Sequence, residues 1–209
     1  ANLHLYKFLG CKEKKKLETD LTIGINSPEK MAVQAKDFVV KGVNILKVKL
    51  GKNPKEDIQR IKLIAEETTD KIKLRIDANQ GWNYEDALHV LAALKNHNIE
   101  FCEQPLHKHH DYLLPKLKKN SSIKIMADES AFDNYDAIRL IEAGACDYIN
   151  IKFAKSAGIF EAQKINAVCE ERNIHCMMGG MLESRVALTA FAHFATAFGN
   201  IKFYDMDTC

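Results

Sequence analysis

Carboxylate residues stand directly after three short apolar segments of this chain, at the positions where buried strands would end. Asp77 follows IKLRI, Glu103 follows IEFC and Asp128 follows IKIMA, with spacings of 26 and 25 residues. Carboxylates that share one edge of a sheet repel one another unless a cation compensates their charge. Ligand sets made only of oxygen suit Mg²⁺, with Mn²⁺ as the alternative ion. The pattern therefore predicts a divalent-metal site formed by Asp77, Glu103 and Asp128.

Lysines occupy the corresponding positions in the segments on either side of this acidic set. Lys49 lies 28 residues before Asp77, and Lys152 lies 24 residues after Asp128. A lysine held near other cations has a lowered pKa and can act as a base near neutral pH. Removal of a proton next to a metal-bound carboxylate leaves an enediolate, whose charge the metal would stabilise. Two lysines on opposite faces of the α-carbon would remove and return the proton from opposite sides, which inverts a stereocentre.

Each of these residues also has a simpler interpretation when it is considered alone. A single aspartate after a strand commonly caps a helix or forms a turn, and a single lysine there is commonly solvated. Carboxylates recur on three neighbouring segments, with a lysine segment on each side, and this repetition favours the metal-site interpretation.

Eight short β-rich segments alternate with longer amphipathic stretches along the chain. The β-rich segments cover residues 21–26, 44–50, 72–78, 99–104, 123–128, 147–153, 174–179 and 201–207. Between them we expect seven helices, such as the one in residues 27–42, which has a Ser cap, a Pro at the first helical position and a Gly stop. The last stretch, residues 182–199, is rich in Ala and apolar almost all round, so we expect a well-covered helix.

This alternation of strands and helices indicates the fold class. Strict alternation predicts a parallel sheet, and eight units of about 25 residues favour a closed barrel over an open sheet. The carboxyl ends of all strands in such a barrel lie at one rim, where barrel enzymes carry their chemistry. No G-x-G-x-x-G turn follows the first strand, which argues against a dinucleotide-binding sheet. No Pro- or Ser-rich linker divides the chain, so we expect one domain.

Composition argues against several other classes of protein. The chain has 209 residues, 46% of them apolar, which is enough for one good core. Its 30 basic and 28 acidic residues give no basic surface for nucleic acid. No apolar run approaches the roughly 20 residues of a membrane span, and the first residues lack the features of a signal peptide. The six cysteines show no C-x-x-C spacing, so we expect buried thiols and a cytoplasmic protein.

The motifs that carry the charged residues occur in a specific order. They are KVK at 47–49, RIDANQGW at 75–82, EQP at 103–105, ADES at 127–130 and NIK at 150–152. In this order they resemble the muconate-lactonizing subgroup of the enolase superfamily. The resemblance implies a TIM-like (β/α)7β barrel over residues 21–209, with residues 1–20 as the link from an α+β capping domain that this chain lacks. It assigns Mg²⁺ to the three carboxylates and proton exchange to Lys49 and Lys152.

Two further features narrow the resemblance to the dipeptide epimerases. A mandelate-racemase-like site needs a histidine at the end of strand 7, whereas His175 lies near the start of that strand. Asp205 and Asp207 end the last strand, and in dipeptide epimerases such a pair binds the substrate's free α-ammonium, since a buried ammonium needs opposite charge. The simpler interpretation is that two acids close a strand at a solvated rim. By the same resemblance, Lys47 assists Lys49 beside the substrate carboxylates. The residues expected to line the peptide are Thr22, Gly180, Met181 and Leu182.

The resemblance implies a Mg²⁺-dependent epimerase that inverts the α-carbon of the C-terminal residue of a dipeptide such as L-Ala-L-Glu, in cell-wall peptide metabolism. The first alternative is another reaction of the subgroup, by a cycloisomerase, an o-succinylbenzoate synthase or an N-acylamino acid racemase, none of which needs the Asp-x-Asp pair. The second is a non-catalytic barrel fragment, because the family's capping domain closes the site. The expected partner is a small dipeptide rather than nucleic acid or a membrane, and barrels of this kind often form homo-oligomers.

Overall fold

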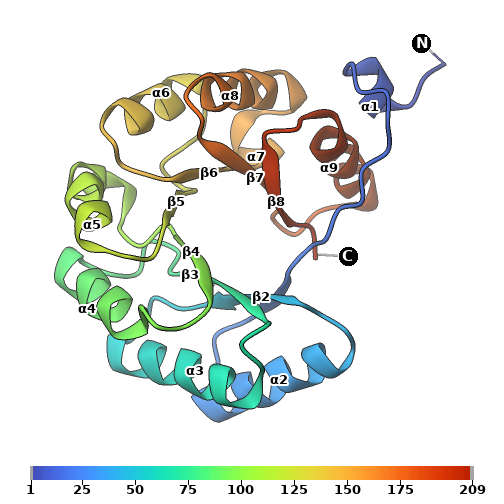
Figure 1. Ribbon diagram of the computed structural model, residues 1–209. Coiled ribbons are helices and arrows are strands. Elements are labelled where there is room, and N and C mark those ends of the chain that lie inside the picture. The colour runs from blue at the N-terminus through green and yellow to red at the C-terminus, as the bar shows by residue number, and fades with distance from the viewer. Residues whose placement is uncertain (1, 208–209) are drawn as a thin grey trace. The chain divides into compact units, whose positions relative to one another are not determined.

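Strands and helices alternate along residues 2–207, which the computed structural model of the chain describes (Figure 1). Contacts between residues group them into two compact units. The larger unit comprises residues 20–130 and 142–147, and the smaller unit comprises residues 2–19, 131–141 and 148–207.

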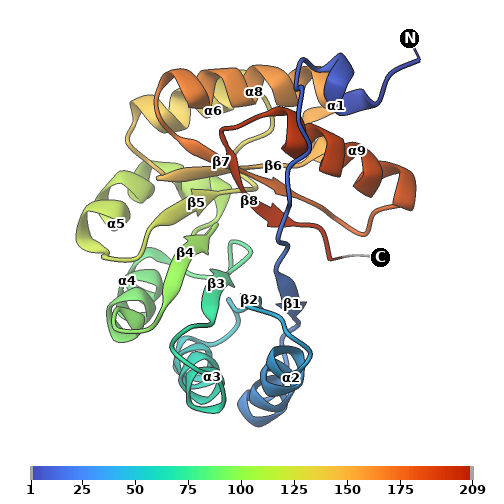
Figure 2. The ribbon, with the colours of Figure 1, turned by 45° about the vertical axis from the view of Figure 1, so that its right-hand side comes forward.

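The larger unit is built around five parallel strands that pair in chain order. The strands are β1 (Leu21–Ile23), β2 (Ile45–Lys49), β3 (Lys73–Asp77), β4 (Ile99–Glu103) and β5 (Ile125–Ala127). Their connections contain α2 (Pro28–Val40), α3 (Pro54–Glu67), α4 (Tyr84–Leu94), the 3₁₀ helix η1 (Lys108–Leu113) and α5 (Leu114–Asn120). In this unit the α-helices lie along one face of the strands (Figure 2).

Local sequence sets the helix starts of the larger unit. Pro28 and Pro54 lie in the first turns of α2 and α3, where a missing N–H leaves no hydrogen bond unmade. Asn53 caps α3, because its side chain accepts hydrogen bonds from two backbone N–H groups of the first turn. Ser27 holds the N-cap position of α2 without a side-chain capping bond, so this part of the predicted cap is wrong. Before it, Asn26 Oδ1 accepts a hydrogen bond from the Ser27 N–H at 2.9 Å.

The strands of the larger unit are largely buried, as is typical of a parallel sheet covered by helices. Leu46 in β2 and Ile76 in β3 are fully buried. The pairing aligns Lys49 with Asp77 and Asp77 with Glu103. The carboxyl ends of β2, β3 and β4 therefore carry charged residues side by side.

The smaller unit holds three parallel strands that also pair in chain order. The strands are β6 (Tyr148–Ile151), β7 (His175–Gly179) and β8 (Ile201–Asp205). The helices are α1 (Leu5–Phe8), most of α6 (Asn134–Glu142), α7 (Phe153–Ser156), α8 (Ile159–Glu171) and α9 (Arg185–Ala197). The prediction that α9 is well covered is wrong, because its buried residues are Phe191, Phe194 and Ala195, and Val186 is 81% exposed. Alanines present little apolar area, so one buried stripe anchors this helix.

The predicted alternation of strands and helices is confirmed within each unit. All eight β-rich segments contain a strand, although β1 ends at Ile23 instead of residue 26 and β8 ends at Asp205 instead of residue 207. Cys11 is partly exposed, and Cys209 lies outside the described residues. The buried thiols are Cys102, Cys146, Cys169 and Cys176. Between residues 2 and 207, no helix has the length and apolar character needed to cross a membrane.

Candidate active site

Three carboxylates lie at the carboxyl ends of neighbouring strands in the larger unit. Asp77 is the last residue of β3, Glu103 is the last residue of β4, and Asp128 directly follows β5. Asp77 and Glu103 are fully buried, and Asp128 is 1% exposed. Because β3, β4 and β5 pair in parallel, these ends share one edge of the sheet. The structure thus brings together the three residues that the sequence predicts as metal ligands.

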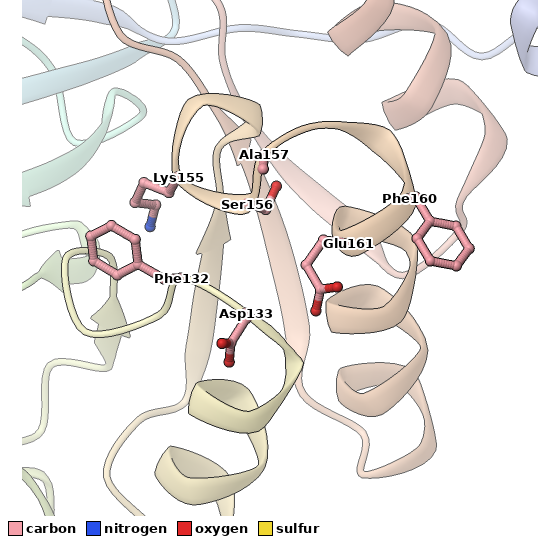
Figure 3. A pocket seen from close by; sticks show the side chains of 7 residues that line it. All are labelled: Phe132, Asp133, Lys155, Ser156, Ala157, Phe160 and Glu161. Atoms are coloured by element: carbon pink, nitrogen blue, oxygen red, sulfur yellow. The ribbon is translucent and has the colours of Figure 1, made fainter.

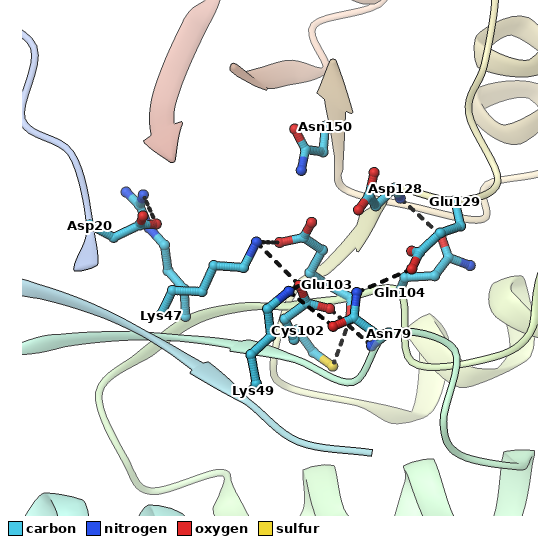
Figure 4. A network of polar contacts seen from close by, with 12 residues as sticks. Asp20, Lys47, Lys49, Asn79, Cys102, Glu103, Gln104, Asp128, Glu129 and Asn150 are labelled. Atoms are coloured by element: carbon cyan, nitrogen blue, oxygen red, sulfur yellow. Dashed lines mark hydrogen bonds and ion pairs between the residues drawn. The ribbon is translucent and has the colours of Figure 1, made fainter. Parts of the chain in front are cut away.

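Two lysines of β2 contact this carboxylate cluster (Figure 4). Lys47 Nζ lies 2.8 Å from Glu103 Oε2 and 3.2 Å from Asp77 Oδ2. Lys49 Nζ lies 2.6 Å from Asp77 Oδ2 and donates a second hydrogen bond to Asn79 Oδ1 at 2.9 Å. Lys47 is 1% exposed, so its charge depends on these carboxylate partners for stabilisation.

Asn79 connects Lys49 to a further carboxylate. Its Nδ2 donates a hydrogen bond to Glu129 Oε1 at 3.1 Å, and its backbone N–H donates to Asp77 Oδ1 at 2.9 Å. Asn79 has a φ of 42°, a left-handed conformation that asparagine tolerates better than most residues. Glu129 is absent from the predicted site residues, and its signal in the sequence is its place beside Asp128 in the ADES motif.

The two lysines do not balance the negative charge of this cluster. Burial and the negative charge of Asp128 both raise the pKa of Asp77. The positive charges of Lys47 and Lys49 outweigh them and hold that pKa below its ordinary value. Burial and the charge of Asp128 raise the pKa of Glu129. Among the described residues of the larger unit, the cluster holds four carboxylates and two ammonium groups. Such an all-oxygen donor set with excess negative charge fits a hard divalent cation such as Mg²⁺.

The loop after β2 packs closely against the loop after β3, and this contact fixes both strand ends. A Cβ on Gly51 would lie 2.1 Å from the carbonyl oxygen of Ala78, so a larger residue does not fit there. Asp57 in α3 accepts hydrogen bonds from Gly51 N and Trp82 Nε1, each at 2.9 Å. Arg60 Nη1 donates to Asp57 Oδ1 at 2.7 Å and completes this buried support.

Most of the other predicted site residues belong to the smaller unit. Lys152 directly follows β6, is 5% exposed and is the N-cap residue of α7. Asp205 is the last residue of β8 and is 5% exposed, and Asp207 lies two residues further along the chain. Gly179 pairs with Asp205 across β7 and β8, so the predicted peptide-lining segment Gly180–Leu182 begins beside the end of β8.

The remaining predictions concern a residue of β1, two residues of the peptide-lining segment and the histidine of β7. Thr22 lies in β1 of the larger unit, which pairs with β2. Met181 and Leu182 are 46% and 96% exposed. His175 is the first residue of β7, and its Nδ1 lies 3.1 Å from Asn200 Oδ1. This histidine therefore lies at the strand start, as predicted, and a mandelate-racemase-like base at the strand end is absent from β7.

A separate pocket of about 420 Å³ lies beside α7 in the smaller unit (Figure 3). It is lined by Phe132, Asp133, Lys155, Ser156, Ala157, Phe160 and Glu161. Lys155 Nζ donates to the carbonyl oxygen of Asn150, and Glu161 accepts hydrogen bonds from Asn134 N and Lys164 Nζ. Lys155 thus contacts strand β6, and Glu161 bonds to the first residue of α6 and to Lys164 in its own helix, α8.

Comparison with known proteins finds epimerases that are similar to this chain along nearly its whole length. The family model described as Enolase C-terminal domain-like matches residues 30–209. The D-Ala-D/L-Ala epimerase of Cytophaga hutchinsonii is 45% identical over 208 residues, which cover 100% of this chain and 56% of that protein. The L-Ala-D/L-Glu epimerase of Clostridium acetobutylicum is 45% identical over 205 residues, which cover 97% of this chain and 57% of that protein. The chain therefore spans little more than half the length of these relatives.

A solved structure shows the same similarity in three dimensions. The dipeptide epimerase from Cytophaga hutchinsonii, complexed with Mg and the dipeptide D-Ala-L-Val, has a TM-score of 0.95 and 44% identity, over 97% of this chain and 55% of that chain. The predicted α/β fold class of the enolase superfamily and the resemblance to its dipeptide epimerases are confirmed by these matches. This chain belongs to the enolase C-terminal domain-like family.

Proposed function

We propose that this chain carries the metal-binding and proton-transferring part of a Mg²⁺-dependent dipeptide epimerase, which inverts the α-carbon of the C-terminal residue. The observation that carries the proposal is the contact of Lys47 and Lys49 with the buried carboxylates Asp77 and Glu103. Removal of a proton next to a carboxylate needs a base and charge stabilisation, and this cluster offers both. The epimerases that match over nearly the whole chain support the same reaction class.

The metal would be held by Asp77, Glu103 and Asp128, which are buried oxygen donors at adjacent strand ends. When bound, Mg²⁺ supplies positive charge next to the substrate carboxylate and makes the α-proton more acidic. Lys47 adds a second, fixed positive charge at the same edge of the sheet, so we propose that it also binds the substrate carboxylate.

Lys49 and Lys152 would exchange the α-proton between opposite faces of the substrate. The neutral amine of one lysine takes the proton, which breaks the C–H bond. The ammonium of the other lysine then donates a proton to the opposite face, which forms a new C–H bond. The reverse reaction uses the same groups with exchanged roles. Substrate and product have the same oxidation state, so the reaction consumes no electron acceptor or donor.

Asp205 and Asp207 would bind the free α-ammonium of the dipeptide through charge-assisted hydrogen bonds. Thr22 and the segment Gly180–Leu182 would line the peptide, and the pairing of β7 with β8 supports a role for that segment. Residues 1–20 would link the barrel to a capping domain, a proposal supported by the greater length of the matched relatives.

Proton NMR of L-Ala-L-Glu in D₂O with Mg²⁺ and the protein tests this function. We expect the glutamate α-proton signal to disappear by exchange with deuterium while signals of L-Ala-D-Glu appear, and we expect EDTA to stop both. A Lys49→Ala variant should lose inversion but still exchange the α-proton that faces the other lysine. If a panel of dipeptides shows no exchange while N-acylamino acids exchange, the dipeptide proposal gives way to the other reactions of the subgroup.

A further inference from the structure

Gln104 occupies a strained and fully buried position directly after Glu103. Its side chain is 0% exposed, and its φ is 33°. A residue other than glycine rarely adopts positive φ, and it does so at an energetic cost unless its surroundings hold it there. The contacts of Gln104 explain how this conformation is maintained.

The side-chain amide of Gln104 uses all of its hydrogen-bonding capacity. Its Oε1 accepts hydrogen bonds from Asp128 N at 2.9 Å and Ser130 N at 3.2 Å. Its Nε2 donates to Leu106 O at 2.9 Å and to Ser130 Oγ at 2.7 Å. Asp128 N and Ser130 N can only donate, and Leu106 O can only accept. The amide oxygen must therefore face the two N–H groups, and the amide nitrogen must face Leu106 O.

The backbone of Gln104 makes contacts on both sides of its own strand. Its N–H donates to Met126 O at 2.9 Å in β5, and its carbonyl oxygen accepts from Gln80 N at 2.8 Å in the loop after β3. One residue thus bonds to the segments that follow Asp77 and precede Asp128, and it is the chain neighbour of Glu103. Gln104 therefore bonds directly to the backbone of Asp128, bonds to Gln80 three residues after Asp77, and directly follows Glu103 in the chain.

We propose that Gln104 is a positioning residue of the proposed metal site, and that its amide ties the backbone at Asp128 to the residue that follows Glu103. This inference rests on the proposed function, because it takes these carboxylates as metal ligands. In the absence of a cation, like charges drive the ligands apart. The amide opposes this movement, since it fixes the backbone at Asp128 and Ser130 to the residue next to Glu103. The amide thereby limits the movement of the Asp128 backbone away from Glu103 before an ion binds.

Mn²⁺ binding, followed by the electron paramagnetic resonance signal of free Mn²⁺, tests the proposal without reference to turnover. Gln104→Met keeps the size of the side chain and removes its hydrogen bonds, whereas Gln104→Asn tolerates positive φ but is too short to reach Asp128 N. We expect both to weaken Mn²⁺ binding by about ten- to a hundredfold. Asn98→Ala is the matched control, because the Asn98 amide bonds to the carbonyl groups of Asp70 and Ile72 at the other end of the strands. It should bind Mn²⁺ like the wild type.

Two results would overturn the inference. The first is wild-type Mn²⁺ affinity in a folded Gln104→Met or Gln104→Asn variant, while the wild type itself binds Mn²⁺. The second needs no variant: in the metal-free wild type, the amide protons of Asp128 and Ser130 should exchange slowly, and exchange at the rate of open-chain amides would mean that the amide does not hold them. A wild type that fails to bind Mn²⁺ would overturn the proposed metal site itself, so the two failures are distinguishable.

Discussion

Among single residues, Lys47 carries a charged ammonium group in a buried position of the larger unit. It is one of the largest fully buried side chains of the chain, and its Nζ contacts both Asp77 and Glu103. A buried ammonium is stable when carboxylates hold its charge, and buried carboxylates depend on a cation in the same way. Lys47 therefore provides part of the positive charge that the cluster requires.

We predict that Lys47→Met lowers the free energy of unfolding of the metal-free protein by about 3 kcal/mol, because it removes a charge partner from two buried carboxylates. Mg²⁺ should restore more stability to this variant than it adds to the wild type, since the ion then replaces the missing charge. Thermal unfolding with Mg²⁺ and with EDTA measures both effects. Equal midpoints for variant and wild type in EDTA would contradict the prediction.

The control for this comparison is Lys36→Met. Lys36 Nζ lies 2.7 Å from Glu67 Oε2, but the two side chains are 62% and 45% exposed. A solvated ion pair of this kind contributes less than about 1 kcal/mol. The variant should therefore unfold close to the wild-type midpoint in either condition.

The sequence predicts single residues best where a charge interrupts an apolar pattern. Asp77 and Glu103 could be assigned because each ends an apolar segment at the spacing of one strand–helix unit. Glu129 and Gln104 could not, because their roles depend on partners elsewhere in the chain, such as Asn79, which lies 50 residues before Glu129. A sequence pattern reports where a residue lies on its element, and it does not report which residue of another strand lies opposite.

At the scale of elements, the loop after β2 lies in close contact with the loop after β3. Gly51 in this loop has a φ of 99°, and a Cβ there would lie 2.1 Å from Ala78 O. We predict that Gly51→Ala lowers the free energy of unfolding by about 3 kcal/mol, because strain in the backbone adds to a clash. Gly42→Ala is the matched control, with a φ of 90° and no atom within 4 Å of the added Cβ. It should cost about 1 kcal/mol, and equal losses in urea unfolding would contradict the role of the contact.

The pair β3–β4 carries a second ionic network, which makes its stability depend on pH. Arg75 Nε donates to Glu100 Oε2 and Arg75 Nη1 donates to Asp20 Oδ2, each at 2.8 Å. Burial raises the pKa of Glu100, but Arg75 and Lys73 outweigh it and hold the pKa below its ordinary value of 4.5. Folding therefore favours the ionised form of this carboxyl group.

We predict from this shift that Glu100→Gln is less stable than the wild type at neutral pH and that the difference shrinks in acid. A carboxyl group with a lowered folded-state pKa stabilises the protein above its unfolded pKa, and this stabilisation is lost as the pH falls through the folded-state value. The window thus lies below the ordinary value of 4.5. Urea unfolding across this range measures the difference, and a difference that stays constant would contradict the assignment.

The strands could be predicted in number and order, but their ends could not, and the expected seven helices were too few because two of the connections hold two helical segments each, η1 with α5 and α7 with α8. β1 was harder to delimit than β3 because its length is set by pairing with β2, which covers Leu21 to Ile23. Ser27 lies at the N-cap of α2 as expected, but its side chain makes no capping bond, which a pattern of residue types does not resolve. The buried residues of α9 are Phe191, Phe194 and Ala195, and an apolar composition does not indicate which side of the helix faces the rest of the chain.

At the scale of the whole molecule, the proposed site residues fall into two groups with different tasks. The metal ligands and Lys49 belong to the larger unit, whereas Lys152 and the Asp205–Asp207 pair belong to the smaller unit. In the proposed function, metal binding and recognition of the substrate ammonium would therefore depend on different residues. This division makes the two tasks separable by mutation.

We predict that a double variant with Asp205→Asn and Asp207→Asn loses epimerisation of L-Ala-L-Glu but binds Mn²⁺ like the wild type. An amide offers no negative charge to the substrate ammonium, while the three proposed metal ligands are unchanged. NMR measures turnover and paramagnetic resonance measures Mn²⁺ affinity. Asp136→Asn is the control, because Asp136 Oδ1 lies 3.2 Å from Arg139 Nη2 in a partly exposed pair on α6. Weakened Mn²⁺ binding in the double variant would contradict the division of tasks, and full turnover would favour the subgroup reactions that need no ammonium site.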